Sequence, residues 1–263
     1  HEGQYDNMNA FFRTNGYDEV FSQENYPADK VVNSFGVQDD FLYDYAIPVL
    51  NQRAATGQPF FATLLSISNH PPYVIPPFFH PKTSEPETQI VEYADWALRQ
   101  FFEEARKQPW FDNTIFVLEG DHGKLVGDAE CELPESYNHI PLMIYSSRIQ
   151  PEEKTTFGGQ VDIQPTILGL LNIDYLQNNF GVDLLKEERP CMFYTADNMV
   201  VGRNDTLLYL YNYETQQELT YDIGNGKLNA VPMDDSFLPL KEYSFSMLQS
   251  AEFLVKHGKT LNS

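Results

Sequence analysis

The stretch Leu118-Glu119-Gly120-Asp121-His122-Gly123 joins a short apolar run, residues 114–118, to a turn that carries a carboxylate and an imidazole. A short apolar run bounded by polar turn residues is typical of a buried strand. The two glycines allow the backbone to fold tightly enough for the acidic and imidazole side chains to converge. Because open α/β sheets bind their ligands at the carboxyl ends of strands, we expect a functional site at this turn.

Asp121 and His122 are candidate ligands of a divalent metal. Oxygen and nitrogen donors of this kind suit Zn or Mn, and the carboxylate also suits Mg or Ca. The alternative, judged on local sequence alone, is a surface loop in which the aspartate caps backbone amides. The pair therefore needs support from other parts of the chain.

Two further histidines lie beside predicted strands. His70 follows the apolar run 60–66 and is a candidate proton donor to a leaving alkoxide; the alternative is a histidine packed beneath the proline-rich loop 71–81. His139 precedes the predicted strand 140–145, so it needs a different loop path to reach the same edge of a sheet. These positions nevertheless make both side chains candidates for the same site as the Asp-His pair.

Apolar periodicity predicts helices that alternate with buried strands. The predicted helices cover residues 39–54, 85–108 and 161–171, with a short one near 7–14, and the predicted strands cover 60–66, 114–118 and 140–145. This alternation favours an α/β fold with a largely parallel sheet. The inner face of the second long helix is expected to be formed by Val91, Ala94, Leu98, Phe101 and Phe102.

The pattern changes after Pro190. Short antiparallel strands are predicted at 191–194, 199–201 and 206–213, followed by a polar turn region, 214–229, and a final helix near 240–257. No linker-like stretch separates this part from the preceding residues. We therefore expect two parts of one domain: a core of residues 1–189, and an appended small antiparallel sheet with a terminal helix, residues 190–263.

The composition limits the possible partners. The formal net charge of -21 repels nucleic-acid backbones, so binding of DNA or RNA is not expected, and an anionic ester substrate would need a local cation. The 42% of apolar residues suffice for a packed core, but no run approaches the roughly 18 apolar residues of a membrane-spanning helix. Cys131 and Cys191 form either one disulfide or two free thiols.

Four stretches between residues 1 and 185, in the same order, resemble motifs of the alkaline phosphatase/sulfatase superfamily. Within it, the chain looks like the C-terminal portion of the catalytic domain in the lipoteichoic acid synthase and phosphoglycerol transferase branch. The stretches are Asn15-Gly16-Tyr17-Asp18 with Phe35-Gly36-Val37-Gln38-Asp39, Pro59-Phe60-Phe61-Ala62 running to Ser66-Ile67-Ser68-Asn69-His70-Pro71-Pro72-Tyr73, Gly120-Asp121-His122-Gly123, and Asp162-Ile163-Gln164-Pro165-Thr166-Ile167-Leu168.

The resemblance implies a fold and a site. The fold would be an alkaline phosphatase-like sheet flanked by helices. Asp121 and His122 would bind the catalytic divalent metal, whose identity (Mn, Zn, Mg or Ca) stays open. His70 would contact the phosphate or the leaving group, and His1 and His139 would line the substrate pocket. By the same likeness, Asp162 would satisfy amides near a helix start.

The implied activity is that of a phosphoglycerol transferase or phosphodiester hydrolase that acts outside the cytoplasmic membrane on lipid-linked glycerophosphate. Residues 5–8 lack the Trp and Arg of the family's F-W-N-R element, which weakens the assignment of glycerophosphate. The family's nucleophilic Thr, a further acidic ligand and the membrane anchor would lie upstream of His1, so we expect an incomplete site that is inactive alone. The alternatives are a sulfatase and a non-catalytic binding module of the same fold.

Overall fold

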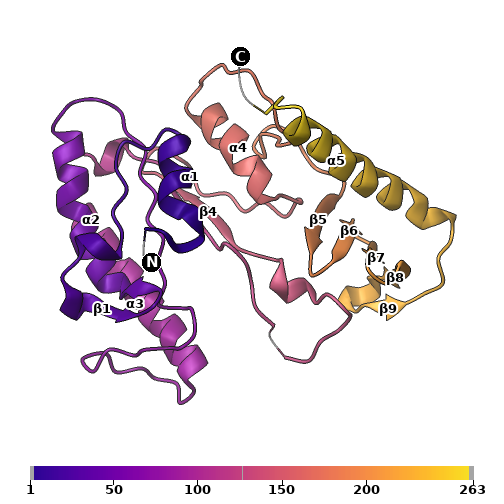
Figure 1. The fold of residues 1–263 in the computed structure, drawn as a ribbon, viewed down its shortest axis with the longest axis horizontal. Coiled ribbons are helices and arrows are strands. Elements are labelled where there is room, and N and C mark those ends of the chain that lie inside the picture. Colours follow the sequence, from indigo (N-terminus) through magenta and orange to yellow (C-terminus); the bar gives the residue numbers. More distant parts are fainter. Residues whose placement is uncertain (1–2, 126, 261–263) are drawn as a thin grey trace. The chain divides into compact units, whose positions relative to one another are not determined.

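The computed structural model describes residues 3–125 and 127–260, which form two compact units (Figure 1). The first unit comprises residues 1–116 and 144–149, and the second comprises residues 117–143 and 150–263. No helix in the described ranges is both long enough and apolar enough to cross a membrane. The division into a core, 1–189, and an appended part, 190–263, stays a prediction.

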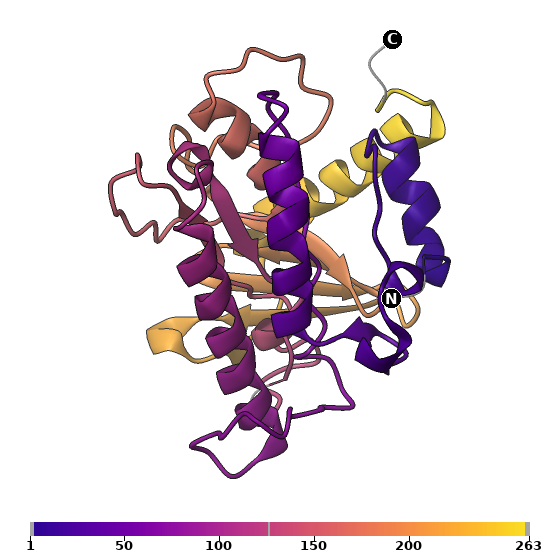
Figure 2. The same ribbon diagram turned by 90° about the vertical axis from the view of Figure 1, so that its left-hand side faces the viewer.

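Two long helices form most of the core of the first unit. They are α2, Asp39–Ala54, and α3, Pro86–Ala105, which lie side by side (Figure 2); a shorter α1 covers Met8–Thr14. The prediction for α2 matches at both ends. The buried side chains between and below α2 and α3 are Ala46, Leu50, Phe101, Ala105, Trp110 and Phe111.

The inner face of α3 differs from the prediction. Val91 is 50% exposed, whereas its neighbour Ile90 is fully buried. Of the five residues that were expected to form the inner face, only Phe101 is buried. The apolar arc of this helix is wide, so two faces satisfy the helical period, and the contacts made by neighbouring elements decide between them. The buried face consists of Ile90, Tyr93, Ala97, Phe101 and Ala105.

The predicted strand at 60–66 was wrong. These residues are exposed and form no regular strand, and Phe61 is 79% exposed. A strand requires a neighbour that accepts and donates backbone hydrogen bonds, and β propensity alone does not supply one. The segment then turns at Ile67 and Ser68, which are both buried, and leads directly to His70.

Four short strands form two small sheets. β1, Val31–Asn33, pairs antiparallel with β2, Gly36–Val37. β3, Phe116–Glu119, pairs with β4, Leu142–Tyr145, so the two strands predicted around the Asp-His turn are confirmed with shifted ends. The turn therefore begins at the last residue of a strand, as the sequence indicated.

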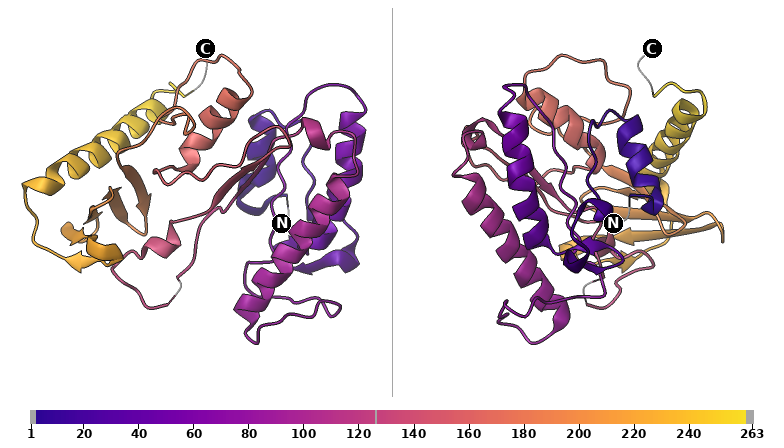
Figure 3. Two further views of the ribbon diagram at one scale, coloured as in Figure 1. Left: turned by 180° about the vertical axis from the view of Figure 1, so that it is seen from behind. Right: turned by 60° about the vertical axis from the view of Figure 1, so that its left-hand side comes forward.

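The second unit contains a five-stranded antiparallel sheet covered by a long helix (Figure 3). The helix α5, Leu238–Lys256, packs mainly against β6 and β5, and its side chains also reach β7. The predicted small C-terminal sheet and terminal helix are therefore confirmed. The strands are β5, Met192–Ala196; β6, Met199–Arg203; β7, Leu207–Asn212; β8, Gln217–Asp222; and β9, Asn229–Ala230.

β8 was missed, because its residues were assigned to a polar turn. All six residues of β8 pair with β7, from Asn212–Gln217 to Leu207–Asp222. Gln217 and Glu218 are exposed, whereas Thr220 and Tyr221 are buried. Polar side chains are tolerated on the solvent side of an antiparallel strand, so the polar composition did not exclude this one.

Candidate active site

The turn after β3 presents its two candidate ligands to solvent. The side chains of Asp121 and His122 are 76% and 69% exposed. The backbone N–H of His122 donates to Asp121 Oδ1 at 2.9 Å, which fixes the carboxylate above the turn. Asp121 Oδ2 then lies 3.9 Å from His122 Nε2.

The tautomer of His122 suits a metal ligand. Its Nδ1 lies 2.7 Å from the carbonyl oxygen of Gly123, so in the neutral ring Nδ1 carries the proton and donates it. The lone pair then resides on Nε2, the nitrogen that faces Asp121. A backbone carbonyl that fixes the ring in this way is the usual partner of a metal-binding histidine.

The separation of the two donor atoms is close to that of two ligands on one ion. Bonds of about 2.0–2.2 Å from metal to imidazole nitrogen and carboxylate oxygen place two ligands of a tetrahedral ion roughly 3.4 Å apart. Asp121 Oδ2 and His122 Nε2 lie 3.9 Å apart, and a small rotation of these exposed side chains would bring them to that distance. Within residues 3–125 and 127–260, no group of three or more His, Cys, Asp or Glu residues is placed to hold a metal. The pair thus fits as part of a ligand set.

The charge near the turn also favours a cation. Burial raises the pKa of the Glu119 carboxyl, and the negative charge of Asp121 raises it further. A positive ion beside the Glu119 carboxylate would offset the repulsion that it experiences from the negative charge of Asp121. A cation at this turn would therefore stabilise charge that the turn already concentrates.

Gly123 permits a close approach of two backbone segments. Its N–H donates to the carbonyl of Tyr137 at 2.9 Å, and a Cβ at this position would lie 2.0 Å from the carbonyl oxygen of Ser136. Such an overlap excludes every residue but glycine without movement of the backbone. The turn is therefore fixed on its C-terminal side against the short 3₁₀ helix Glu135–Tyr137.

His139 lies two residues after this contact. Its backbone N–H donates to the carbonyl of Glu135 at 2.8 Å, and its side chain is exposed. The segment that carries His139 thus borders the Asp-His turn through the hydrogen bond between Gly123 and Tyr137. The segment before His139 therefore runs next to the Asp-His turn, although His139 precedes its strand. A role for His139 in substrate binding stays a prediction.

The loop that carries His70 is fixed from below by a buried carboxylate. Asp39 Oδ1 accepts the backbone N–H groups of Ile67 at 3.1 Å and Ser68 at 3.0 Å, while the N–H of Asp39 donates to Ser68 Oγ at 3.0 Å. Burial raises the pKa of Asp39, and the hydrogen bonds from Ser68 and Ile67 lower it in part. No role for Asp39 was predicted from the sequence.

The ring of His70 is held on two sides. Nδ1 lies 2.6 Å from the carbonyl oxygen of Pro71, and the ring lies over that of Phe35 with 3.8 Å between centroids. In the neutral ring this leaves Nε2 unprotonated, and in the imidazolium Nε2 carries a proton that it can donate. Phe35, which belongs to one of the stretches that resemble superfamily motifs, thus packs against this imidazole.

The predicted site residues are distributed over the two units. The second unit brings Asp121 and His122 together, with the His139 segment beside them. His70 belongs to the first unit. His1 lies outside the described residues.

The structure also tests the predictions made for Asp162 and for the two cysteines. Asp162 accepts the backbone N–H of Gly159 at 2.8 Å and that of Val182 at 2.8 Å, so its predicted role in satisfying amides is confirmed. The sequence missed its ion pair with Arg189. Cys131 and Cys191 are both free thiols, so the disulfide alternative is not the one that the structure contains.

The family model described as sulfatase matches residues 1–173 of the chain. Lipoteichoic acid synthase 1 of Bacillus subtilis (strain 168) is 27% identical in an alignment of 243 positions, which covers 84% of this chain and 36% of that protein. Lipoteichoic acid synthase of Staphylococcus aureus (strain USA300) is 24% identical, covering 69% of this chain and 31% of that protein. The chain thus spans about a third of the length of these curated relatives.

Solved structures share the fold. An alkaline phosphatase superfamily protein from Vibrio parahaemolyticus has a TM-score of 0.86 and 26% identity, over 100% of this chain and 65% of that chain. A phosphonate monoester hydrolase from Silicibacter pomeroyi has a TM-score of 0.59 and 18% identity, over 92% of this chain and 67% of that chain. The fold class predicted from the sequence is confirmed by these likenesses.

Proposed function

Because the chain belongs to the sulfatase family, we propose that it supplies part of the active site of a metal-dependent phosphoglycerol transferase or phosphodiester hydrolase. The observation that carries this proposal is the carboxylate–imidazole pair, with 3.9 Å between Asp121 Oδ2 and His122 Nε2. The similarity to two lipoteichoic acid synthases supports glycerophosphate esters as the substrate class. Lipid-linked glycerophosphate and a location outside the cytoplasmic membrane are parts of the same proposal.

Asp121 and His122 would hold a divalent ion through Oδ2 and Nε2. When bound, such an ion supplies positive charge that stabilises the phosphoryl oxygens of a reacting ester. Within the described residues this turn brings two donors together, and the chain spans about a third of its curated relatives, so we propose that a longer polypeptide supplies the nucleophile and the remaining ligands. The activity then belongs to the longer polypeptide.

His70 would donate a proton from Nε2 to the leaving oxygen of the ester. Its Nδ1 stays bonded to the Pro71 carbonyl in both protonation states, so the ring keeps one orientation while Nε2 gains and loses its proton. Phe35 supports the ring from one face. Asp39, through Ser68 and Ile67, sets the path of the loop that presents the ring.

Replacement of His70 by Gln in the longer polypeptide tests this role. For a diester with an alkyl leaving group, kcat is expected to fall by about 10² to 10⁴, the usual contribution of a general acid. For an ester that releases a nitrophenol, the loss is expected to be much smaller, because that leaving group departs without a proton. Steady-state rates on the two substrates, measured at equal metal content, give the comparison.

The matched control is His80→Gln. His80 is an exposed histidine in the same unit, and its replacement is expected to leave both rates unchanged. Equal losses on the two esters in the His70 variant, or no loss on either, would remove His70 as the proton donor. The alternative function, a sulfatase, instead predicts that the longer polypeptide cleaves sulfate esters in preference to phosphodiesters.

A further inference from the structure

We infer that Gln160 is a positioning residue for the Asp121–His122 turn, and that a buried ion pair between Asp162 and Arg189 fixes the backbone from which it reaches. The inference rests on the proposed function, because it takes the turn to be a metal site. All four elements of the argument lie in the second unit: the turn, the glutamine, the ion pair and the segment around Val182.

The side chain of Gln160 bridges two successive carbonyls of the turn. Its Nε2 donates to the carbonyl oxygen of Gly120 at 3.2 Å and to that of Asp121 at 3.0 Å. These carbonyls lie on the N-terminal side of the turn, whereas Gly123 is fixed on the C-terminal side by Tyr137. Together the two contacts restrain both flanks of the pair of candidate ligands.

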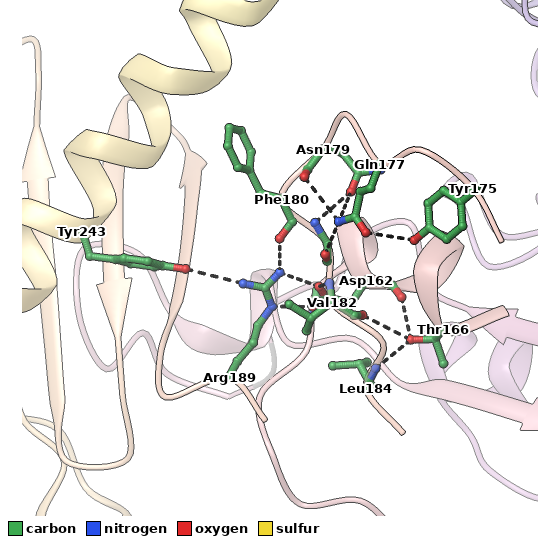
Figure 4. A network of polar contacts seen from close by, with 12 residues as sticks. Asp162, Thr166, Tyr175, Gln177, Asn179, Phe180, Val182, Leu184, Arg189 and Tyr243 are labelled. Carbon is green, nitrogen blue, oxygen red and sulfur yellow. Dashed lines mark hydrogen bonds and ion pairs between the residues drawn. The ribbon is translucent and has the colours of Figure 1, made fainter. Parts of the chain in front are cut away.

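Gln160 starts the 3₁₀ helix Gln160–Asp162, whose backbone is fixed by the carboxylate of its last residue. Asp162 Oδ2 accepts the N–H of Gly159 at 2.8 Å and the Nε–H of Arg189 at 2.7 Å. Asp162 Oδ1 accepts from Arg189 Nη2 and from the N–H of Val182. Four donors therefore converge on one carboxylate, as Figure 4 shows for the arginine and Val182.

The ion pair is almost completely removed from water. Asp162 is 0% exposed and Arg189 is 7% exposed, and the guanidinium also donates to the carbonyl of Phe180 and, at 3.5 Å, to the hydroxyl of Tyr243 (Figure 4). An ion pair with this many hydrogen-bond partners is held in one geometry, because the loss of any of these contacts would leave a buried charge without a partner at a cost in free energy. Gln160 therefore extends from a rigid base.

The hydrogen bonds from Gln160 to the turn matter because the candidate ligands are exposed. The side chains of Asp121 and His122 are exposed and are oriented by hydrogen bonds to the backbone of the turn itself, so the direction of each donor atom depends on that backbone. Groups that orient metal ligands without touching the metal typically contribute 10- to 100-fold in metal affinity. Gln160 acts here through carbonyls rather than through the ligand side chains, so we expect the lower end of that range.

Gln160→Ala and Gln160→Met in the longer polypeptide test the inference by isothermal titration with Mn²⁺. Methionine keeps the length of the side chain but has no N–H, so both variants are expected to bind Mn²⁺ about tenfold more weakly than the wild type. The control is Gln164→Ala, an exposed glutamine four residues away that accepts a hydrogen bond from Asn179 and is expected to bind Mn²⁺ normally. Thermal unfolding of the three variants should agree within a few degrees.

Two results separate the inference from the function on which it rests. Wild-type Mn²⁺ affinity in both Gln160 variants, together with loss of Mn²⁺ in Asp121→Ala, would overturn the positioning role and leave the metal site standing. Wild-type Mn²⁺ affinity in Asp121→Ala would overturn the metal site, and the role of Gln160 would fall with it. We expect a tenfold loss of Mn²⁺ affinity in both Gln160 variants, wild-type affinity in the Gln164 variant and loss of Mn²⁺ in Asp121→Ala.

Discussion

Asp121→Ala in the longer polypeptide is expected to remove stoichiometric divalent metal and to reduce phosphodiester cleavage to the background rate. The carboxylate contributes Oδ2 to the ligand pair, and its Oδ1 fixes the turn by accepting the N–H of His122. Alanine removes both functions at once. Elemental analysis of the purified protein and the initial rate with saturating Mn²⁺ measure the two effects.

The matched control is Asp174→Ala, which removes an exposed carboxylate from the same unit. It changes the net charge by the same amount, so it reports any general electrostatic effect on metal uptake. Full metal content and full activity are expected for this variant. Retention of metal in Asp121→Ala at the level of the control would take Asp121 out of the site.

Arg189→Met is expected to lower the free energy of unfolding of the chain by about 3–5 kcal/mol. The substitution leaves the Asp162 carboxylate at 0% exposure with two backbone N–H donors and no counter-charge. The energetic cost arises mainly from the unpaired buried charge rather than from the lost contact itself. Urea denaturation followed by circular dichroism measures the change.

Two further variants identify the cause of that loss. Lys186→Met breaks an ion pair in the same unit between an exposed lysine side chain and the Asp183 carboxylate, which keeps its contact with water only in part, and we expect a change of about 1 kcal/mol or less. Asp162→Asn combined with Arg189→Met removes both buried charges, so it should recover much of the stability lost in Arg189→Met alone. If Arg189→Met is no more destabilising than Lys186→Met, the buried pair does not support this unit.

Much of the fold was predictable because periodicity is a local property. The ends of α2 and the existence of α3, α4 (Ile163–Leu170) and α5 follow from apolar spacing, and the resemblance to lipoteichoic acid synthases is confirmed by the comparisons. The residues buried on α3 were not predictable, because its apolar arc is wider than the face that packs. The predictions for the segment 60–66 and for β8 were wrong for a related reason. A strand forms only where another part of the chain pairs with it, and local sequence does not reveal that partner.

The site residues likewise divide into those that are close in sequence, which were predictable, and those that act over a long sequence separation, which were not. Asp121 and His122 are adjacent in sequence, so their convergence was predictable, and the strand before them directed attention to the turn. Asp39 and Gln160 were not assigned roles, since each acts on a loop 28 to 40 residues away. Contacts between residues so far apart in the sequence produce no signal in the local sequence pattern. The two glycines of the turn were the available signal, and Gly123 does mark a close approach of two backbone segments.

The most direct test of the central claim compares two esters in one assay of the longer polypeptide. A glycerophosphate diester and an aryl sulfate are each incubated with the protein, with Mn²⁺ and then with excess chelator, and the released products are quantified. We predict cleavage of the phosphodiester that requires the metal, with little release of sulfate. Faster release of sulfate, or phosphodiester cleavage that persists in the presence of chelator, would contradict the proposed function.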